Sequence, residues 1–131
     1  MEGERFGRDA EGRFSPDALA HQIREIGREY ADLRAAAELL DSQRKPMLAK
    51  LTNDARADVV ANGDKCSRRE AQDIAEGCAA YAAHIEATVE AQRLANIARA
   101  NWEAVQSFAR SIQTFEATRR AEMQFHQQRR T

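Results

Sequence analysis

Apolar residues recur at alternating spacings of three and four through the first third of the chain. The residues on this pattern are Leu19, Ile23, Ile26, Tyr30, Leu33, Ala37 and Leu40. Such a repeat places an apolar stripe on one face of a helix, which is typical of a coiled-coil seam. Ser15 and Pro16 stand before it in the order preferred for an N-cap and a first helical position. The pattern therefore predicts a long helix that begins at about residue 15.

The stripe is interrupted where Arg44 occupies the next seam position and Pro46 follows. Proline removes a backbone donor and pushes against the preceding turn, so we expect the first helix to be kinked or broken near Pro46. An apolar face then resumes and ends at Asn62 and Gly63, where the glycine suits a helix C-terminus. Its residues are Met47, Leu48, Leu51, Ala55, Val59 and Val60. The first helix is expected to span about 15–62.

Ser67 and Glu70 open a second helical run with the spacing of a capping box, in which each side chain bonds the backbone N–H of the other residue. No proline follows before the C-terminus, so we expect one helix over about 67–125, joined to the first by a turn at 63–66. Its predicted apolar face comprises Ile74, Cys78, Tyr81, Ile85, Val89, Trp102, Val105, Ala109 and Ile112. The small residues Ala91, Ala95, Ala98 and Ala100 either permit a close neighbouring helix or reflect helix propensity alone.

Composition supports an all-α fold, because Pro and Gly are scarce (2 and 6 of 131 residues) and aromatic residues make up only 6%. We predict a long antiparallel, coiled-coil-like helical hairpin over 15–127, with a flexible N-terminal arm (1–14) and a basic C-terminal tail (126–131). A narrow seam buries little surface, so we also expect the chain to form a homo-oligomer. The expected interface residues are Leu19, Ile23, Ile26, Tyr30, Leu33, Leu40, Trp102, Phe108 and Phe115.

Charged side chains alternate in sign along the chain, although the formal net charge is −1. Residues 44–69 hold 7 basic and 3 acidic side chains and residues 108–131 hold 5 and 2, whereas 17–43 and 70–107 are mainly acidic. The two basic blocks would lie at opposite ends of a hairpin, where each is suited to bind nucleic-acid phosphates or an acidic partner. The candidate binding residues are Lys45, Lys50, Arg56, Lys65, Arg68, Arg69, Arg110, Arg119, Arg120, Arg129 and Arg130.

Two ordinary explanations compete with this interpretation. A single charged residue on a long helix usually serves only to keep the surface solvated, so the clustering alone favours binding. Phe108, Phe115 and Phe125 lie among the C-terminal arginines and have the chemistry to stack on unpaired bases. Rings at helical spacing more often face another helix, and we favour that role for them.

No enzyme signature is present in the sequence. His21, His84 and His126 are far apart, and neither a His-Glu-x-x-His motif, a Cys-x-x-Cys pair nor a glycine-rich phosphate loop occurs. Cys66 and Cys78 match no zinc or redox spacing, so we expect unpaired thiols. We predict a protein that is not an enzyme and that uses no cofactor, no metal and no small-molecule substrate.

The sequence also lacks a run that approaches 18 apolar residues, and no apolar stretch follows its charged start. We therefore expect no signal peptide and no contact with a membrane, and a location in the cytoplasm.

The block from Arg110 to Met123 contains an Arg-Ser segment that leads to Glu-Ala-Thr and then to Arg-Ala-Glu-Met. It resembles the ending of a widespread group of small phage and prophage proteins, in which an Arg-Ser/Thr segment leads to Glu-Ala-Thr-x-Arg-Ala-Glu-Met. Upstream, residues 43–51, the Ser67-x-x-Glu70-Ala71 motif and the Ala80-Tyr81 pair fall in the same order. The similarity covers about residues 28–125. Pro46 and the glycine-bearing N-terminal arm depart from the pattern of the group.

Genes of this group often lie among those for phage recombination and single-strand binding, so the resemblance implies an accessory of DNA metabolism. The layout is also similar to the recombination mediator of T-even phages, a small helical oligomer that helps to load a recombinase on single-stranded DNA. We therefore expect a non-enzymatic accessory of phage DNA recombination or replication that binds single-stranded DNA or a recombination partner. The alternatives are a protein-binding inhibitor of a host defence system or host enzyme, and a structural coiled-coil component of an assembly.

Overall fold

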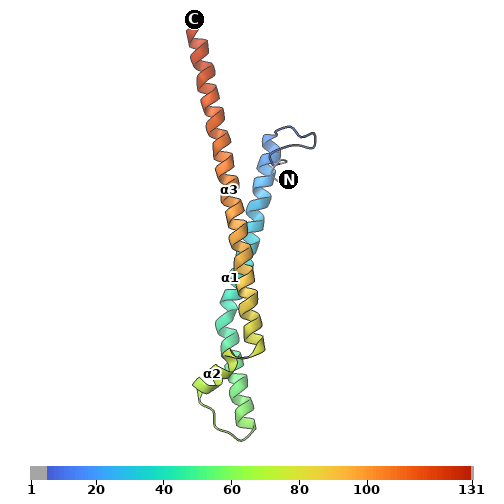
Figure 1. The fold of residues 1–131 in the computed structure, drawn as a ribbon, viewed down its shortest axis with the longest axis vertical. Helices are drawn as coiled ribbons and strands as arrows, with labels where there is room; N and C mark the ends of the chain where they lie inside the picture. Colours follow the sequence, from blue (N-terminus) through green and yellow to red (C-terminus); the bar gives the residue numbers. More distant parts are fainter. Residues whose placement is uncertain (1–5, 131) are drawn as a thin grey trace. The chain divides into compact units, whose positions relative to one another are not determined.

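The computed structural model describes residues 6–130, which form three α-helices: α1 (Pro16–Ala61), α2 (Arg68–Glu76) and α3 (Ala79–Arg129). Within this range no β-strand occurs, and the prediction of an all-α fold is confirmed. The long helices α1 and α3 pack together (Figure 1).

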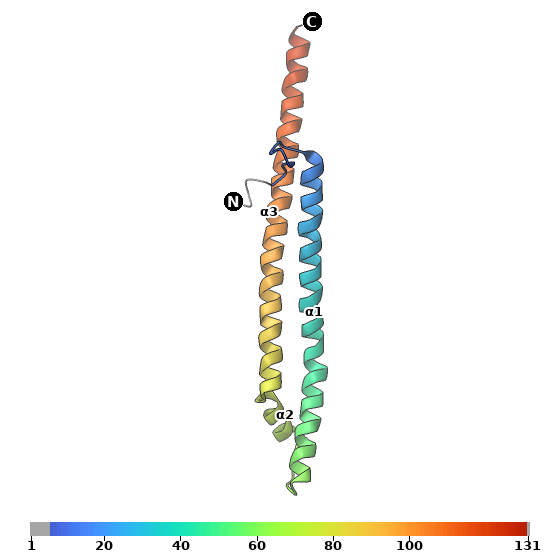
Figure 2. The same cartoon turned by 90° about the vertical axis from the view of Figure 1, so that its right-hand side faces the viewer.

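The chain divides into two compact units, each of which includes part of α1 and part of α3. We call residues 6–30 and 98–130 the terminal unit and residues 31–97 the central unit. Within each unit the parts of α1 and α3 lie side by side and run in opposite directions (Figure 2). The central unit also holds α2.

The inward face of α1 follows the predicted stripe. Every seam residue from Leu19 to Leu40 is buried or half-buried, with Leu19 and Ala37 the most enclosed. Ser15 caps the helix as expected, because its hydroxyl accepts a hydrogen bond from the backbone N–H of Ala18 at 3.3 Å. Val60, which we expected on the apolar face, is exposed.

Of the kink or break expected at Pro46, the break is wrong, since α1 is uninterrupted from Pro16 to Ala61, and a kink stays a prediction. Pro46 and the residue four positions before it, Ser42, are both exposed. Pro46 has no N–H to donate to the Ser42 carbonyl, and water can solvate this carbonyl instead. The proline therefore removes only one hydrogen bond from the helix. The apolar face on either side of Pro46 keeps the helix in place.

Residues 6–14, which we expected to belong to a flexible arm, form a hydrogen-bonded loop on the terminal unit. The Gly7 N–H donates to the Gln22 side-chain oxygen at 2.6 Å, and an isolated bridge joins Arg8 and Phe14. Gly7 has φ +74°, a conformation that favours glycine, and the Phe14 and Leu19 side chains contact the space around it. The remainder of the predicted arm, residues 1–5, lies outside the described residues.

α1 ends at the predicted glycine. Gly63 has φ +85°, its N–H donates to the Val60 carbonyl at 3.0 Å, and the Asp64 N–H donates to the Val59 carbonyl at 3.3 Å. This pair of bonds is a Schellman motif, which satisfies carbonyls at a helix C-terminus.

The second helical run is divided in two, contrary to our expectation of one helix over 67–125. Ser67 caps α2 by accepting the Glu70 N–H at 3.2 Å, but α2 ends at Glu76 and α3 begins at Ala79. The chain turns at Gly77 and Cys78, where the Cys78 N–H bonds the Ala75 carbonyl at 3.2 Å instead of continuing the α-helical pattern. The turn lets α2 pack on its own side of the long helices. Ala71 and Ala75 of α2 are almost fully buried (0% and 2% exposed).

α3 runs beyond the predicted boundary, and the tail expected at 126–131 is helical as far as Arg129. The inward face of α3 also differs from the predicted one, because Ile74 of α2 and Val89 of α3 are exposed. The residues that are buried or half-buried at spacings of three and four are Tyr81, His84, Thr88, Ala91, Ala95, Ala98, Trp102, Val105, Ala109 and Ile112. This seam is rich in small residues, which bring α3 close to α1.

Each unit has one contact that shows this close approach. In the terminal unit the Trp102 ring lies against Gly27, where an added Cβ would be 3.0 Å from the ring. In the central unit the His84 Nε2 atom lies 2.9 Å from the Leu40 carbonyl oxygen. A carbonyl can only accept, so Nε2 carries the proton and donates it. The seam therefore includes a polar contact from α3 to the backbone of α1.

We predict that Gly27→Leu lowers the free energy of unfolding by about 1–3 kcal/mol, because the new side chain overlaps the Trp102 ring. The tryptophan emission should shift to longer wavelength as the ring moves toward water. Ala20→Leu, at an exposed position of the same helix, is the matched control and should change stability by less than about 0.5 kcal/mol. Equal effects of the two substitutions would contradict the close packing at Gly27.

Pro46→Ala should stabilise the protein by up to about 3 kcal/mol, because it restores a hydrogen bond within an unbroken helix. Urea unfolding followed by circular dichroism measures the change. Lys45→Ala is the control, since it alters the adjacent exposed residue without changing a backbone donor. If both variants unfold at the same urea concentration, proline does not weaken α1.

Candidate nucleic-acid interface

A groove in the central unit brings together two of the predicted basic residues from different helices. Lys45 of α1 and Arg68 of α2 line the same hollow of about 230 Å³. The other lining residues are Leu48, Ala49, Thr52, Asn53 and Gln72. The short helix α2 creates this groove, because its buried alanines hold Arg68 beside α1.

The polar groups of this groove are arranged for an anionic ligand. Among the ion pairs within residues 6–130, none involves Lys45 or Arg68. Thr52 donates to the Leu48 carbonyl at 2.7 Å, and the Gln72 amide donates to Glu76 at 3.0 Å. The two cations are therefore available to an anion, and the amides of Asn53 and Gln72 offer further polar contacts.

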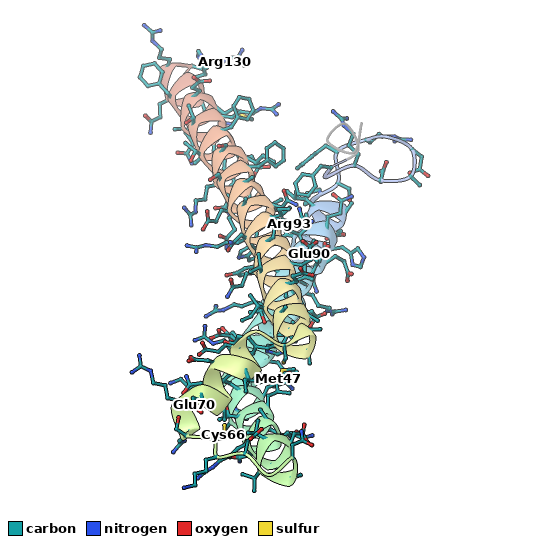
Figure 3. The ribbon with its side chains drawn as sticks, turned by 60° about the horizontal axis from the view of Figure 1, so that its bottom comes forward. Met47, Cys66, Glu70, Glu90, Arg93 and Arg130 are labelled. Atoms are coloured by element: carbon teal, nitrogen blue, oxygen red, sulfur yellow. The ribbon has the colours of Figure 1, made fainter. Side chains whose placement is uncertain are left out.

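Two basic residues of α3, by contrast, are paired with carboxylates of their own helix. Arg93 and Glu90 form a two-pronged pair with N–O distances of 2.9 and 2.7 Å, and Arg99 pairs with Glu103 at 3.0 Å. The Glu90 and Arg93 side chains are labelled in Figure 3. Lys45 and Arg68 differ from Arg93 and Arg99 because neither takes part in an ion pair found within residues 6–130.

The remaining basic residues of the 44–69 block do not join the groove. None of them lines the hollow, although all five are exposed: Arg44, Lys50, Arg56, Lys65 and Arg69. Of the predicted basic residues in 44–69, only Lys45 and Arg68 line this groove. Thr52, Asn53 and Gln72 were not predicted as site residues, because their place in the groove depends on the position of α2.

The second group of predicted basic residues lies on the C-terminal part of α3. No residue from 113 to 130 is buried or half-buried, and we call this stretch the bare segment. Arg120 pairs with Glu116 at 3.7 Å, and the Arg129 guanidinium lies 5.5 Å from the centre of the Phe125 ring. Figure 3 labels Arg130 near the end of this helix. The other predicted basic residues here are Arg110 and Arg119, which are also exposed.

Most of the residues predicted to form an interface between copies instead pack against other residues of the same chain. The seam from Leu19 to Leu40 and Trp102 take part in the packing of α1 with α3. Phe108 contacts the Phe6 ring in an edge-to-face arrangement with centroids 5.5 Å apart. Phe115 differs from all of these, because 69% of its surface is exposed.

Other chemistry is limited within residues 6–130. No group of three or more His, Cys, Asp or Glu side chains is placed to hold a metal ion, and Cys66 and Cys78 are unpaired thiols. None of the described helices carries an apolar stretch that is long enough to cross a bilayer.

The pair with Arg93 perturbs the pKa of the Glu90 carboxyl. The hydrogen bond from Arg93 lowers the pKa of Glu90, and the charge of Arg93 adds to the effect. The same hydrogen bond raises the pKa of Arg93. A lowered pKa means that the pair stabilises the folded chain above the unfolded pKa of Glu90, and that this contribution is lost as the pH falls through the lowered value. Both groups are exposed, so the pair adds little to stability.

We expect Arg93→Gln to raise the pKa of Glu90 toward its ordinary value, because the substitution removes both the charge and the two-pronged geometry. An NMR titration of the Glu90 side-chain carboxyl carbon measures the shift. Arg99→Gln is the control, since Arg99 pairs with Glu103 instead. An unchanged pKa of Glu90 in Arg93→Gln would show that the pair does not persist in solution.

Comparison with known proteins adds no relative: no family model, no curated protein and no solved structure matches the chain.

Proposed function

We propose that the protein is a non-enzymatic accessory of phage DNA recombination or replication that binds single-stranded DNA through its phosphates. The observation that carries this proposal is the groove between α1 and α2, which Lys45 and Arg68 both line and where neither takes part in the ion pairs found within residues 6–130. The groove is open to solvent, as a site for a continuous strand must be.

The two cations suit a phosphodiester for separate reasons. The guanidinium of Arg68 presents a planar set of donors that matches two phosphate oxygens, and the ammonium of Lys45 supplies a compact positive charge. The amides of Asn53 and Gln72 would contact the sugar or a base edge without selecting a particular sequence. Binding of this kind depends mainly on charge, and salt therefore weakens it.

The bare segment supports the same function with a second set of contacts. Arg129 and Arg130 are exposed near its end, and Phe125 presents a ring on which an unpaired base can stack. The sequence of the block from Arg110 to Met123 supports the phage context, through its resemblance to phage and prophage proteins. The proposed partners are thus single-stranded DNA or a protein that processes it.

The proposal predicts that a single-stranded oligonucleotide binds with an affinity that falls as salt rises. Substituting Lys45 and Arg68 together with alanine should weaken binding, because two phosphate contacts are lost. The slope of log affinity against log salt should decrease by about 1.4, or about 0.7 per contact. Fluorescence anisotropy with a labelled oligonucleotide, at several salt concentrations, measures both quantities.

Lys50→Ala combined with Arg56→Ala is the matched control, because it removes the same charge from the same block but outside the groove. Equal losses in the two double variants would mean that general charge, and not the groove, attracts DNA. Absence of binding at low salt would exclude the DNA-binding function and favour the protein-binding inhibitor.

A further inference from the structure

Every residue of the bare segment is exposed in the single chain. It spans residues 113–130, and its exposed apolar side chains are Phe115, Met123 and Phe125. A helix of this length is marginal in water by itself, since most helical stability in proteins comes from packing of an apolar face. A surface that binds another helix would supply this packing.

One stripe of the bare segment continues the seam of the terminal unit. Ile112 is the last half-buried residue of α3, and Phe115, Arg119, Glu122 and His126 follow at spacings of three and four. These spacings keep the side chains on one face of the helix. The stripe therefore extends an existing packing surface beyond the part that α1 covers.

When two copies of this stripe are placed side by side in antiparallel orientation, their charges are complementary. Arg119 and Glu122 lie at equal distances from a point between Arg120 and Ala121. In an antiparallel pair with a two-fold axis at this point, each Arg119 faces Glu122 of the other copy. Phe115 and His126 are also equidistant from the point, so each Phe115 ring faces His126 of the other copy.

We propose that the bare segment binds a second copy of this chain in this antiparallel register. Neither Arg119 nor Glu122 takes part in the ion pairs found within residues 6–130, so both are available for the pairing. Nucleic acid fits this stripe less well, because Glu122 would lie against phosphate. Arg120, which pairs with Glu116 on another face, stays outside the contact.

The size of the contact determines its strength. A pair of helices about 16 residues long extends over only about 24 Å. Such a contact buries less than the roughly 1,200 Å² of a standard stable interface, and we therefore expect a reversible dimer that forms at micromolar concentration.

Charge exchange tests both the partner and the register. Arg119→Glu and Glu122→Arg, each alone, place like charges opposite each other at two points of the dimer, and each should raise the dissociation constant about tenfold. An equimolar mixture of the two single variants should restore association, because every facing pair is again opposite in charge. The double variant Arg119→Glu/Glu122→Arg should also dimerise within about threefold of the original chain. Sedimentation equilibrium without nucleic acid measures each constant.

Lys50→Glu is the control for a charge reversal in the central unit, and it should leave the dissociation constant unchanged. A monomer at all concentrations, or single variants that dimerise as well as the original chain, would overturn the proposal. Failure of the mixture to exceed the single variants would overturn the register. None of these results depends on DNA binding, so the dimer and the proposed function can fail separately.

Discussion

Close approach between α1 and α3 is the constraint on which the rest of the structure depends. In the terminal unit Gly27 leaves room for the Trp102 ring, and in the central unit His84 reaches the Leu40 carbonyl. Both contacts require the backbones to lie near each other. Small side chains on α3, of which Ala95 and Ala98 are the most buried, make this possible.

This kind of seam limits how much apolar surface the single chain can bury. Alanine contributes little area, and none of the large side chains among the described residues is fully buried. The two buried threonines, Thr52 and Thr88, are satisfied locally, because each donates to the carbonyl four residues earlier. A chain with so modest an interior gains stability from any additional helix packed on its exposed apolar side chains.

The groove and the bare segment differ in their distribution of charge. At three places on α3 an acidic and a basic residue pair within about one turn, as Glu90 and Arg93 do. Lys45 and Arg68 come from different helices and take part in no ion pair found within residues 6–130, and α2 rather than local sequence brings them together. The bare segment combines both signs with exposed rings, which suits a contact with protein as well as with nucleic acid.

The sequence by itself determined the helical class, the inward face of α1, the cap at Ser67 and the end of α1 at Gly63. These features depend on residues that are close along the chain, such as the three–four alternation from Leu19 to Leu40 and the φ that Gly63 adopts. The hydrogen-bonded loop at residues 6–14 was not predicted, because its bond from Gly7 to Gln22 joins positions far apart in sequence.

Tertiary structure alone decided the rest. The pattern of large apolar residues predicted Val89 on the inward face of α3. The observed seam instead uses His84, Thr88 and a row of alanines, which fit because α1 lies close to them. The turn at Gly77 and the groove that Lys45 and Arg68 share follow from the docking of α2. Small and polar residues do not stand out in the apolar pattern of a sequence. Their position in the seam is therefore known only once the neighbouring helix is placed.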